Sequence, residues 1–228
     1  MSTPTPYWIV IGDVHGHTAP LERIPELAGA SGVIISGDLT VHGAVPAAQG
    51  VIRAVTARNP RVLAQIGNMD QPAVQAWLDR EGMGIHTRAL ELAPGLGLMG
   101  VGWSTPTPFG TPSETSEEQI ARWLDDTHRQ AAGFEHLILV SHTPPVDTVV
   151  DRTGSGMHVG SRAVRRFIER VQPDLCLTGH IHEARGADTL GRTLVVNPGE
   201  LAAGGYAVVT FDGTTVGCDI RQISGGAA

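Results

Sequence analysis

The sequence predicts an α/β fold, because short apolar runs typical of strands alternate with stretches of helical periodicity. Glycine and proline punctuate these segments, and the C-terminal part is rich in β-forming residues around the hairpin turn Asp212-Gly213. A chain of 228 residues suits one domain, so we expect residues 1–228 to form a single unit.

The first part of the chain alternates strand and helix in a regular order. Pro46 fits the first turn of its helix, whereas Pro25 makes the preceding helix short or kinked. The order strand-helix-strand-helix-strand-helix predicts a parallel sheet with right-handed crossovers. The expected strands cover residues 7–11, 32–36 and 61–66, and the expected helices cover residues 18–28, 45–58 and 72–80.

The second part combines two helices with a larger number of strands. Ser116 and Gln119 have the spacing of a capping box, and Ser161 is expected to cap the other helix. Residues 103–113 are rich in Pro, Thr and Gly and predict a loop, of which residues 103–109 could form a substrate wall or pack. The expected helices are 116–130 and 161–171, and the expected strands are 85–92, 96–101, 136–140, 174–177, 193–196, 205–211 and 214–220.

Composition and charge exclude several classes of function. The net charge of −7, the pI of about 5.8 and the scarcity of aromatic residues argue against a broad grip on long nucleic acid. No apolar run is long enough to cross a membrane, and residues 1–6 lack the features of a signal peptide, so we expect a cytoplasmic protein. Cys176 and Cys218 lie in apolar runs and are expected to be buried thiols.

Five of the predicted strands end in side chains that can bind a metal ion. In parallel sheets ligands bind outside the carboxyl ends of the strands, so these side chains are expected to share a site. Seven side chains are too many for one ordinary ion, whereas two ions sharing a bridging carboxylate use them all. The candidates are Asp13, His15, Asp38, Asn68, His142, His180 and His182.

The order of these blocks resembles the calcineurin-like metallophosphoesterase superfamily, and in particular its small single-domain bacterial and archaeal members. The matching blocks are Gly12-Asp13-Val14-His15, Gly37-Asp38, Gly67-Asn68-Met69-Asp70, His142, Gly179-His180-Ile181-His182 and Asn197-Pro198-Gly199. The resemblance implies a four-layer αββα sandwich, in which helices flank two mixed β-sheets. It also implies a dinuclear centre, with Asp13, His15 and His182 on one metal, Asn68, His142 and His180 on the other, and Asp38 bridging them.

The chemistry of this ligand set agrees with that implication. Two divalent ions bring four positive charges, whereas Asp13, Asp38 and a bridging hydroxide return three, so the pocket stays positive for a phosphate group. The bridging hydroxide would attack the phosphate ester. Mixed oxygen and nitrogen ligands suit Mn, Fe, Co or Zn, of which we favour Mn. We therefore expect a metal-dependent phosphoesterase acting on a small phosphoester.

The chain departs from the family pattern at Met69, where many members carry a histidine that helps to protonate the leaving group. A thioether cannot donate a proton, so we expect weak activity on alkyl monoesters and better activity on diesters. His17 and His42 lie close to ligand motifs, and either could replace the acid. Asp70 is assigned with Asp38 as catalytic because this acidic position supports the family histidine, although a helix cap is the alternative.

Three residues before and within a helix start are candidate substrate ligands, because a helix N-terminus can bind phosphate. They are His158, Ser161 and Arg162, and the alternative is an ordinary serine cap. Phosphomonoesterase or nucleotide pyrophosphatase activity is an alternative function, and a catalytically weak metal-binding interaction scaffold is another. Neither a membrane nor a long nucleic acid is expected as a partner, and the oligomeric state, including a homo-oligomer, is left open.

Overall fold

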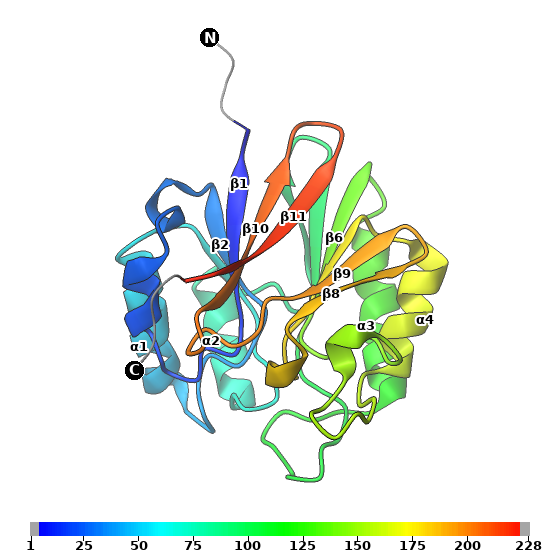
Figure 1. The fold of residues 1–228 in the computed structure, drawn as a ribbon, viewed down its shortest axis with the longest axis horizontal. Coiled ribbons are helices and arrows are strands. Elements are labelled where there is room, and N and C mark those ends of the chain that lie inside the picture. Colours follow the sequence, from blue (N-terminus) through cyan, green and yellow to red (C-terminus); the bar gives the residue numbers. More distant parts are fainter. Residues whose placement is uncertain (1–4, 224–228) are drawn as a thin grey trace.

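The computed structural model describes residues 5–223 and shows two β-sheets packed face to face between helices (Figure 1). The first sheet has the strand order β11-β10-β1-β2-β3, and the second has the order β4-β5-β6-β7-β9-β8. Helices α1 and α2 cover the outer face of the first sheet, and α3 and α4 cover that of the second (Figure 1). The expected αββα sandwich is therefore confirmed.

Both sheets are mixed, with parallel strands in one half of the first sheet and at the centre of the second. In the first sheet β1, β2 and β3 run parallel, and β10 and β11 are antiparallel additions. The strands of this sheet are β1 (Tyr7–Ile11), β2 (Gly32–Ile35), β3 (Val62–Ala64), β10 (Gly205–Phe211) and β11 (Val216–Gln222). Those of the second sheet are β4 (Ala89–Ala93), β5 (Leu96–Val101), β6 (His136–Ser141), β7 (Leu175–Leu177), β8 (Gly186–Leu190) and β9 (Thr193–Asn197).

The helices connect these strands and cover the sheets. The α-helices are α1 (Val45–Thr56), α2 (Pro72–Arg80), α3 (Glu117–Gln130) and α4 (Arg162–Val171). Within residues 5–223, four 3₁₀ turns complete the set: η1 (Ala19–Arg23), η2 (Leu27–Gly29), η3 (Val149–Asp151) and η4 (His182–Ala184). None of the helices within residues 5–223 has the length and apolar character that spanning a bilayer requires.

The alternation of side chains along each strand explains why three apolar layers form. In β1, Ile9 and Ile11 face the helices, whereas Trp8 and Val10 face the opposite sheet. In β6 the same alternation directs Leu139 to α3 and α4 and its neighbours to the space between the sheets. Because both faces of these strands are buried, they appear in the sequence as continuous apolar runs.

Some elements differ from the sequence prediction. Residues 18–28 do not form an α-helix but the turns η1 and η2, because Pro20 and Pro25 remove amide donors from so short a segment. Strand β4 begins at Ala89 rather than at residue 85, and β11 covers Val216–Gln222 rather than 214–220. Strand β8 was not predicted, since its sequence Gly-Ala-Asp-Thr-Leu is weakly β-forming and it lies at the sheet edge.

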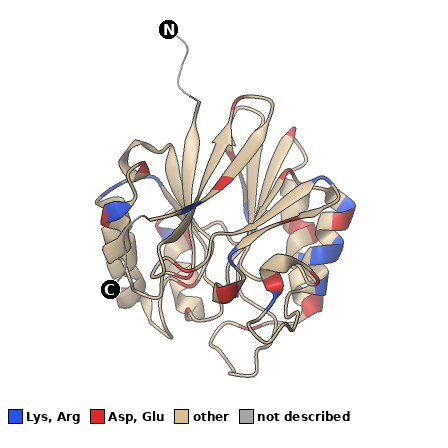
Figure 2. Ribbon diagram, viewed as in Figure 1, with Lys and Arg blue, Asp and Glu red and all other residues tan. Residues whose placement is uncertain are grey.

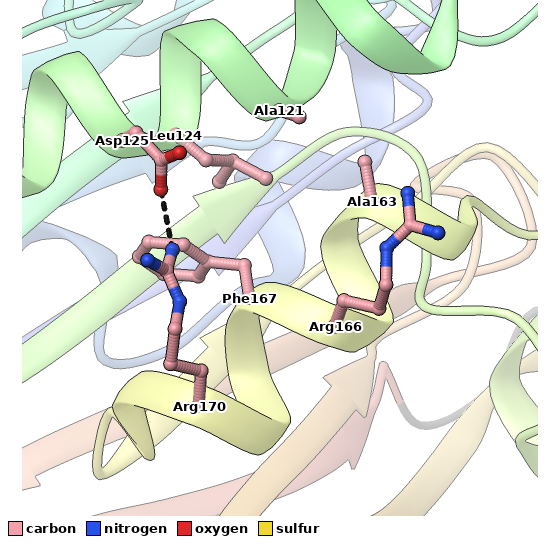
Figure 3. Close-up of a pocket in the computed structure, with 7 residues that line it drawn as sticks. All are labelled: Ala121, Leu124, Asp125, Ala163, Arg166, Phe167 and Arg170. Atoms are coloured by element: carbon pink, nitrogen blue, oxygen red, sulfur yellow. Dashed lines mark hydrogen bonds and ion pairs between the residues drawn. The ribbon is translucent and has the colours of Figure 1, made fainter.

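Helices α3 and α4 pack side by side and leave a hollow of about 300 Å³ on their outer surface (Figure 3). The basic segments of α4 stand out on this side of the molecule (Figure 2). Arg170 pairs with Asp125 on α3 and lies 5.6 Å from the ring centroid of Phe167 (Figure 3). Arg166 and Arg170 of α4 therefore line the hollow, and their aliphatic stems contribute to its surface.

Candidate metal centre

The loops after β1 and β2 are joined by backbone hydrogen bonds, which bring their polar side chains together. The amides of Val14 and His15 donate to the carbonyl of Asp38 at 2.8 and 3.0 Å, and the amide of Asp13 donates to Gly37 at 3.2 Å. Asp13 and Asp38 are both buried. The carboxyl ends of neighbouring parallel strands thus place two carboxylates at one edge of the sheet, as expected for such folds.

The backbone in these loops adopts conformations that most residues avoid. Asp13, His15, Asp38 and His180 have φ values of 48°, 47°, 50° and 71°, in the left-handed region. Such strain accumulates at functional sites, where the surrounding structure holds it in place. Close approach also requires glycine at position 67, where a Cβ would lie 2.1 Å from Asp38 Oδ1.

One group of candidate ligands consists of Asp13, His15 and His182. The His15 Nε2 and His182 Nε2 atoms are 3.1 Å apart, and His182 Nε2 is 3.6 Å from Asp13 Oδ1. One ligand atom from each of the three residues lies within 4.8 Å of the others. This grouping joins the end of β1 to η4, which lie 167 residues apart in the sequence.

The second group surrounds the side-chain oxygen of Asn68. His142 Nε2 lies 3.1 Å and His180 Nδ1 lies 2.7 Å from Asn68 Oδ1. Asp38 Oδ2 lies 3.4 Å from His142 Nε2 and 3.8 Å from His15 Nε2, so one oxygen stands between the two groups. The structure therefore brings all seven sequence-predicted ligands into one cluster.

Contacts outside the cluster hold several of these side chains in orientation. His15 Nδ1 lies 3.2 Å from the carbonyl of Thr40, and His182 Nδ1 lies 3.4 Å from a Glu200 oxygen, so both rings turn Nε2 inward. Asn68 donates its amide hydrogen to Thr111 Oγ1 at 3.0 Å, which turns its oxygen toward the histidines. Partners of this kind orient metal ligands in known sites.

The electrostatics of the cluster favour a bound cation. Burial raises the pKa of Asp13, but its hydrogen bond to His182 and neighbouring imidazoles outweigh this and lower it to about 2. Burial lowers the pKa of His142, yet the negative charges of Asp38 and Asp13 raise it to about 9. The carboxylates thus keep a proton on this imidazole at neutral pH. A divalent cation would supply the same positive charge and release that proton.

The donor set also fits metal ions by its spacing. Two imidazole nitrogens that each lie 2.0–2.1 Å from a tetrahedral ion are roughly 3.3 Å apart. The observed 3.1 Å between the His15 and His182 nitrogens is close to this value. Burial and the neighbouring charge of His142 lower the pKa of His180 to about 4, so this imidazole is neutral, the form that binds metals.

Asp70 holds two loops together and does not face the cluster. Its carboxylate accepts hydrogen bonds from the amides of Leu39 and Thr40 at 3.0 and 2.8 Å and from that of Gly67 at 3.2 Å. The helix-cap alternative is wrong, because Gln71 occupies the N-cap position of α2. Since Asp70 is fully buried and is absent from the described lining of the cavity, its contacts indicate a structural clamp rather than a reacting group.

The start of α4 also differs from the expectation of a phosphate site. Glu117 of α3 occupies it: Ser161 Oγ donates to this carboxylate at 2.7 Å, and the amides of Arg162 and Ala163 donate to it at 2.8 Å each. Ser161 also caps the helix by accepting from the amide three residues ahead. The donors that would bind phosphate are therefore already used by a protein carboxylate.

His158 likewise has a partner within the protein. Its Nδ1 lies 2.7 Å from Asp151 Oδ1, a buried carboxylate that also accepts from the backbone of its own loop. None of His158, Ser161 and Arg162 is among the described residues that line the cavity above the ligand cluster. These three sequence-predicted substrate ligands therefore lie outside the candidate site.

A cavity of about 610 Å³ opens above the cluster. Ligand side chains of the cluster line it, and two further segments form its walls. The first wall comes from the loop of residues 105–111, and the second comes from Thr153, Ser155, Met157 and Val159. The sequence raised residues 103–109 as a possible wall. In the second wall it indicated only His158, whereas the neighbouring Met157 and Val159 line the cavity instead. His42 lines the cavity beside Met69, and its amide donates to the Met69 carbonyl at 2.8 Å. His17 is not among the described lining residues.

The segment Asn197-Pro198-Gly199 supports the cluster from behind. Asn197 donates its side-chain amide to the carbonyl of Ile181 at 2.8 Å and accepts from the amide of Gly199 at 2.8 Å. Because Ile181 lies between His180 and His182, this contact positions the loop that carries both histidines.

Comparison with known proteins identifies the family of this chain. Residues 129–220 match the family model for metallophosphoesterases of the calcineurin superfamily. The chain is 32% identical over 203 residues to an uncharacterized protein of Methanocaldococcus jannaschii, covering 84% of this chain and 88% of that protein. This chain belongs to the calcineurin-like metallophosphoesterase superfamily.

Two solved structures share the fold of this chain. Protein TT1561 of Thermus thermophilus superposes with a TM-score of 0.70 at 18% identity, covering 96% of this chain and 99% of that chain. A dimetal phosphatase from Danio rerio superposes with a TM-score of 0.69 at 13% identity, covering 96% and 97%. Metallophosphoesterases are metal-dependent hydrolases, and the cluster described above supplies this chain with groups that can hold metal ions.

Proposed function

We propose that this protein is a metal-dependent phosphodiesterase that holds two divalent cations, preferably Mn, at the strand ends. Asp13, His15 and His182 would hold one cation, Asn68, His142 and His180 the other, and Asp38 would bind both. The observation that carries this proposal is the position of Asp38 Oδ2, at 3.8 Å from His15 Nε2 and 3.4 Å from His142 Nε2. When bound, such cations activate a water molecule and polarise phosphoryl oxygens.

A backbone amide of the protein fixes the orientation of the proposed bridging carboxylate. Asp38 is held from behind, because its Oδ1 accepts from the amide of Met69 at 2.8 Å, which leaves Oδ2 for the cations. In the reaction the oxygen of water forms a bond to phosphorus and one ester P–O bond breaks. The products are a phosphomonoester and an alcohol or phenol. The proton that water releases ends on the oxygen of the leaving group.

The preference for diesters with good leaving groups follows from Met69. This residue lines the cavity, and its thioether has no proton to give to a departing alkoxide. A phenolate leaves without protonation at neutral pH far more easily than an alkoxide does, because the pKa of its conjugate acid is lower. Aryl phosphodiesters should therefore react faster than unactivated alkyl monoesters.

Steady-state kinetics on purified protein tests this proposal. We expect hydrolysis of bis(4-nitrophenyl) phosphate in the presence of Mn, loss of that activity with EDTA, and little hydrolysis of glycerol 2-phosphate. Met69→His should raise the monoester rate relative to the diester rate, whereas Met69→Leu, which offers no proton, should not. Faster hydrolysis of the alkyl monoester by the unaltered protein would contradict the diester preference.

The same assays separate the enzyme from an interaction scaffold. A scaffold of this fold would bind fewer than two cations per chain, and EDTA would change neither its folding nor the hydrolysis of the aryl diester. Two cations per chain together with EDTA-sensitive hydrolysis would support the enzyme.

A further inference from the structure

We propose that the cavity selects phosphodiesters that carry an uncharged, apolar ester group, and that Phe109 and Met157 are the residues that determine this selectivity. The inference rests on the proposed function, because the cations would hold the phosphate end of the ligand.

Two large apolar side chains line the cavity from different segments of the chain. Phe109 belongs to the wall formed by residues 105–111 and is 85% exposed, and Met157 belongs to the wall formed by residues 153–159 and is 63% exposed. When a ligand covers exposed apolar side chains of this size, the apolar surface removed from water contributes favourably to the free energy of binding. Pro106, Pro108 and Val159 extend the same apolar surface.

Hydrogen bonds within the protein hold the first wall in place. One Glu114 oxygen accepts hydrogen bonds from Thr107 Oγ1 and the Thr111 amide at 2.7 Å each and from Thr111 Oγ1 at 2.6 Å. These bonds close the loop on both sides of Phe109. Because Thr111 also accepts from Asn68, the wall and a proposed metal ligand share one hydrogen-bonded network.

The second wall is a tight hairpin of its own. The Thr153 amide donates to the Met157 carbonyl at 2.9 Å, and the Met157 amide donates to Thr153 Oγ1 at 3.2 Å. The amide of Gly154 donates to a Glu183 oxygen at 3.0 Å, which ties the hairpin to η4. Met157 is therefore presented by an ordered backbone, and its flexible side chain can adapt to different apolar groups.

The charge of the cavity restricts the ligand further. None of the described residues that line it is an arginine, and the sequence contains no lysine. The acid Glu183 stands at the lining instead. A ligand with a second anionic group, such as a nucleoside polyphosphate, would find no arginine or lysine there and would meet this carboxylate. A ligand with a single phosphodiester charge at the cations and an uncharged apolar group at the walls avoids Glu183 and covers Phe109 and Met157.

Binding of simple diesters to the Mn-loaded protein tests the selectivity. Diphenyl and dimethyl phosphate carry the same single charge and differ in the apolar area that the walls can cover. We expect calorimetry, and inhibition of bis(4-nitrophenyl) phosphate hydrolysis, to show diphenyl phosphate binding at least about 10-fold more tightly. Bis(4-carboxyphenyl) phosphate, of similar shape but with two further charges, should bind more weakly than diphenyl phosphate.

Variants assign the effect to the two walls. Phe109→Ala and Met157→Ala should each weaken diphenyl phosphate binding several-fold to about 10-fold and leave dimethyl phosphate unchanged. Val149→Ala is the matched control, because Val149 is an apolar side chain exposed by 55% that lies outside the described cavity lining. Circular dichroism checks that all three variants keep the fold.

The possible results separate this inference from the proposed function. Equal affinities for diphenyl and dimethyl phosphate, equal effects of Phe109→Ala and Val149→Ala, or tighter binding of the tricharged diester would overturn the selectivity while diester hydrolysis remained. Absence of diester binding and of hydrolysis in protein that holds two cations would overturn both.

Discussion

At the scale of single residues, Asp38 is the side chain on which the proposed centre depends most. It is buried, its backbone lies in the left-handed region, and its two oxygens have different partners. The seven candidate ligands could be predicted from sequence because each follows a strand, mostly beside glycine. The Thr111 contact to Asn68 could not, since it depends on a loop 43 residues away.

Replacement of Asp38 tests its place between the two groups. Asp38→Asn keeps the shape of the side chain but removes its charge, so we expect hydrolysis to fall by at least about 100-fold. Atomic absorption should show fewer than two cations per chain, and circular dichroism should show an unchanged fold. Full activity in this variant would refute the assignment of Asp38 to both cations.

Thr111 is expected to position Asn68 rather than to contact a cation. Thr111→Val removes the acceptor of the Asn68 amide hydrogen, so the affinity for one of the two cations should fall by about 10–100-fold. Thr111→Ser, which keeps the hydroxyl, should restore it, and Thr115→Val in the same loop should have little effect. Calorimetric titration with Mn distinguishes the two binding steps. Equal affinities in Thr111→Val and the unaltered protein would contradict this role.

At the scale of elements, the strands and longer helices follow from local patterns, whereas their mutual contacts do not. Apolar runs predicted β1, β2 and β5 closely, and the caps at Ser116 and Ser161 were predicted from spacing. The carboxylate of Glu117 at the start of α4 escaped prediction, because it arises only when α3 and α4 pack together. An anion was expected at this helix end, and a protein side chain supplies it.

The Glu117 contact should stabilise the packing of α3 against α4. Glu117→Gln replaces a carboxylate that accepts three hydrogen bonds at a helix N-terminus by a neutral amide. We expect a loss of about 1–3 kcal/mol in the free energy of unfolding. Urea denaturation measures it, with Glu118→Gln, an exposed acid in the same turn, as control. Diester hydrolysis should persist. Tighter substrate binding in Glu117→Gln without loss of stability would instead restore the phosphate site predicted from sequence.

At the scale of the whole molecule, the ligands come from both sheets. Asp13, Asp38 and Asn68 follow strands of the first sheet, whereas His142 and His180 follow strands of the second. The sequence alone predicted a parallel sheet, and the resemblance to the superfamily supplied the second sheet and the sandwich. Local patterns cannot show which strands share a sheet, because that depends on pairings between segments far apart in the chain.

The stability of the whole molecule should depend on pH through His86. Burial lowers the pKa of this imidazole to about 4, from 6.5, between Trp103 and Trp123, while its Nδ1 accepts from the Gly102 amide. The unfolded chain therefore binds a proton that the folded protein excludes. The contribution of His86 to the free energy of unfolding is fully present above pH 6.5. It is lost as the pH drops toward 4, by up to about 3 kcal/mol.

Urea denaturation between pH 4 and 7, with EDTA present, measures this contribution. His86→Gln cannot take up the proton, so its unfolding free energy should fall less steeply than that of the unaltered protein. His17→Gln, on an exposed loop, is the control and should show the full decrease. Parallel profiles for His86→Gln and the unaltered protein would show that burial of this imidazole is not the source of acid sensitivity.

The most direct test of the central claim is anomalous diffraction from crystals of the protein grown with Mn. We expect two peaks roughly 3.5–4 Å apart, one beside Asp13, His15 and His182, the other beside Asn68, His142 and His180, with Asp38 contacting both. A single peak, or peaks away from Asp38, would contradict the account.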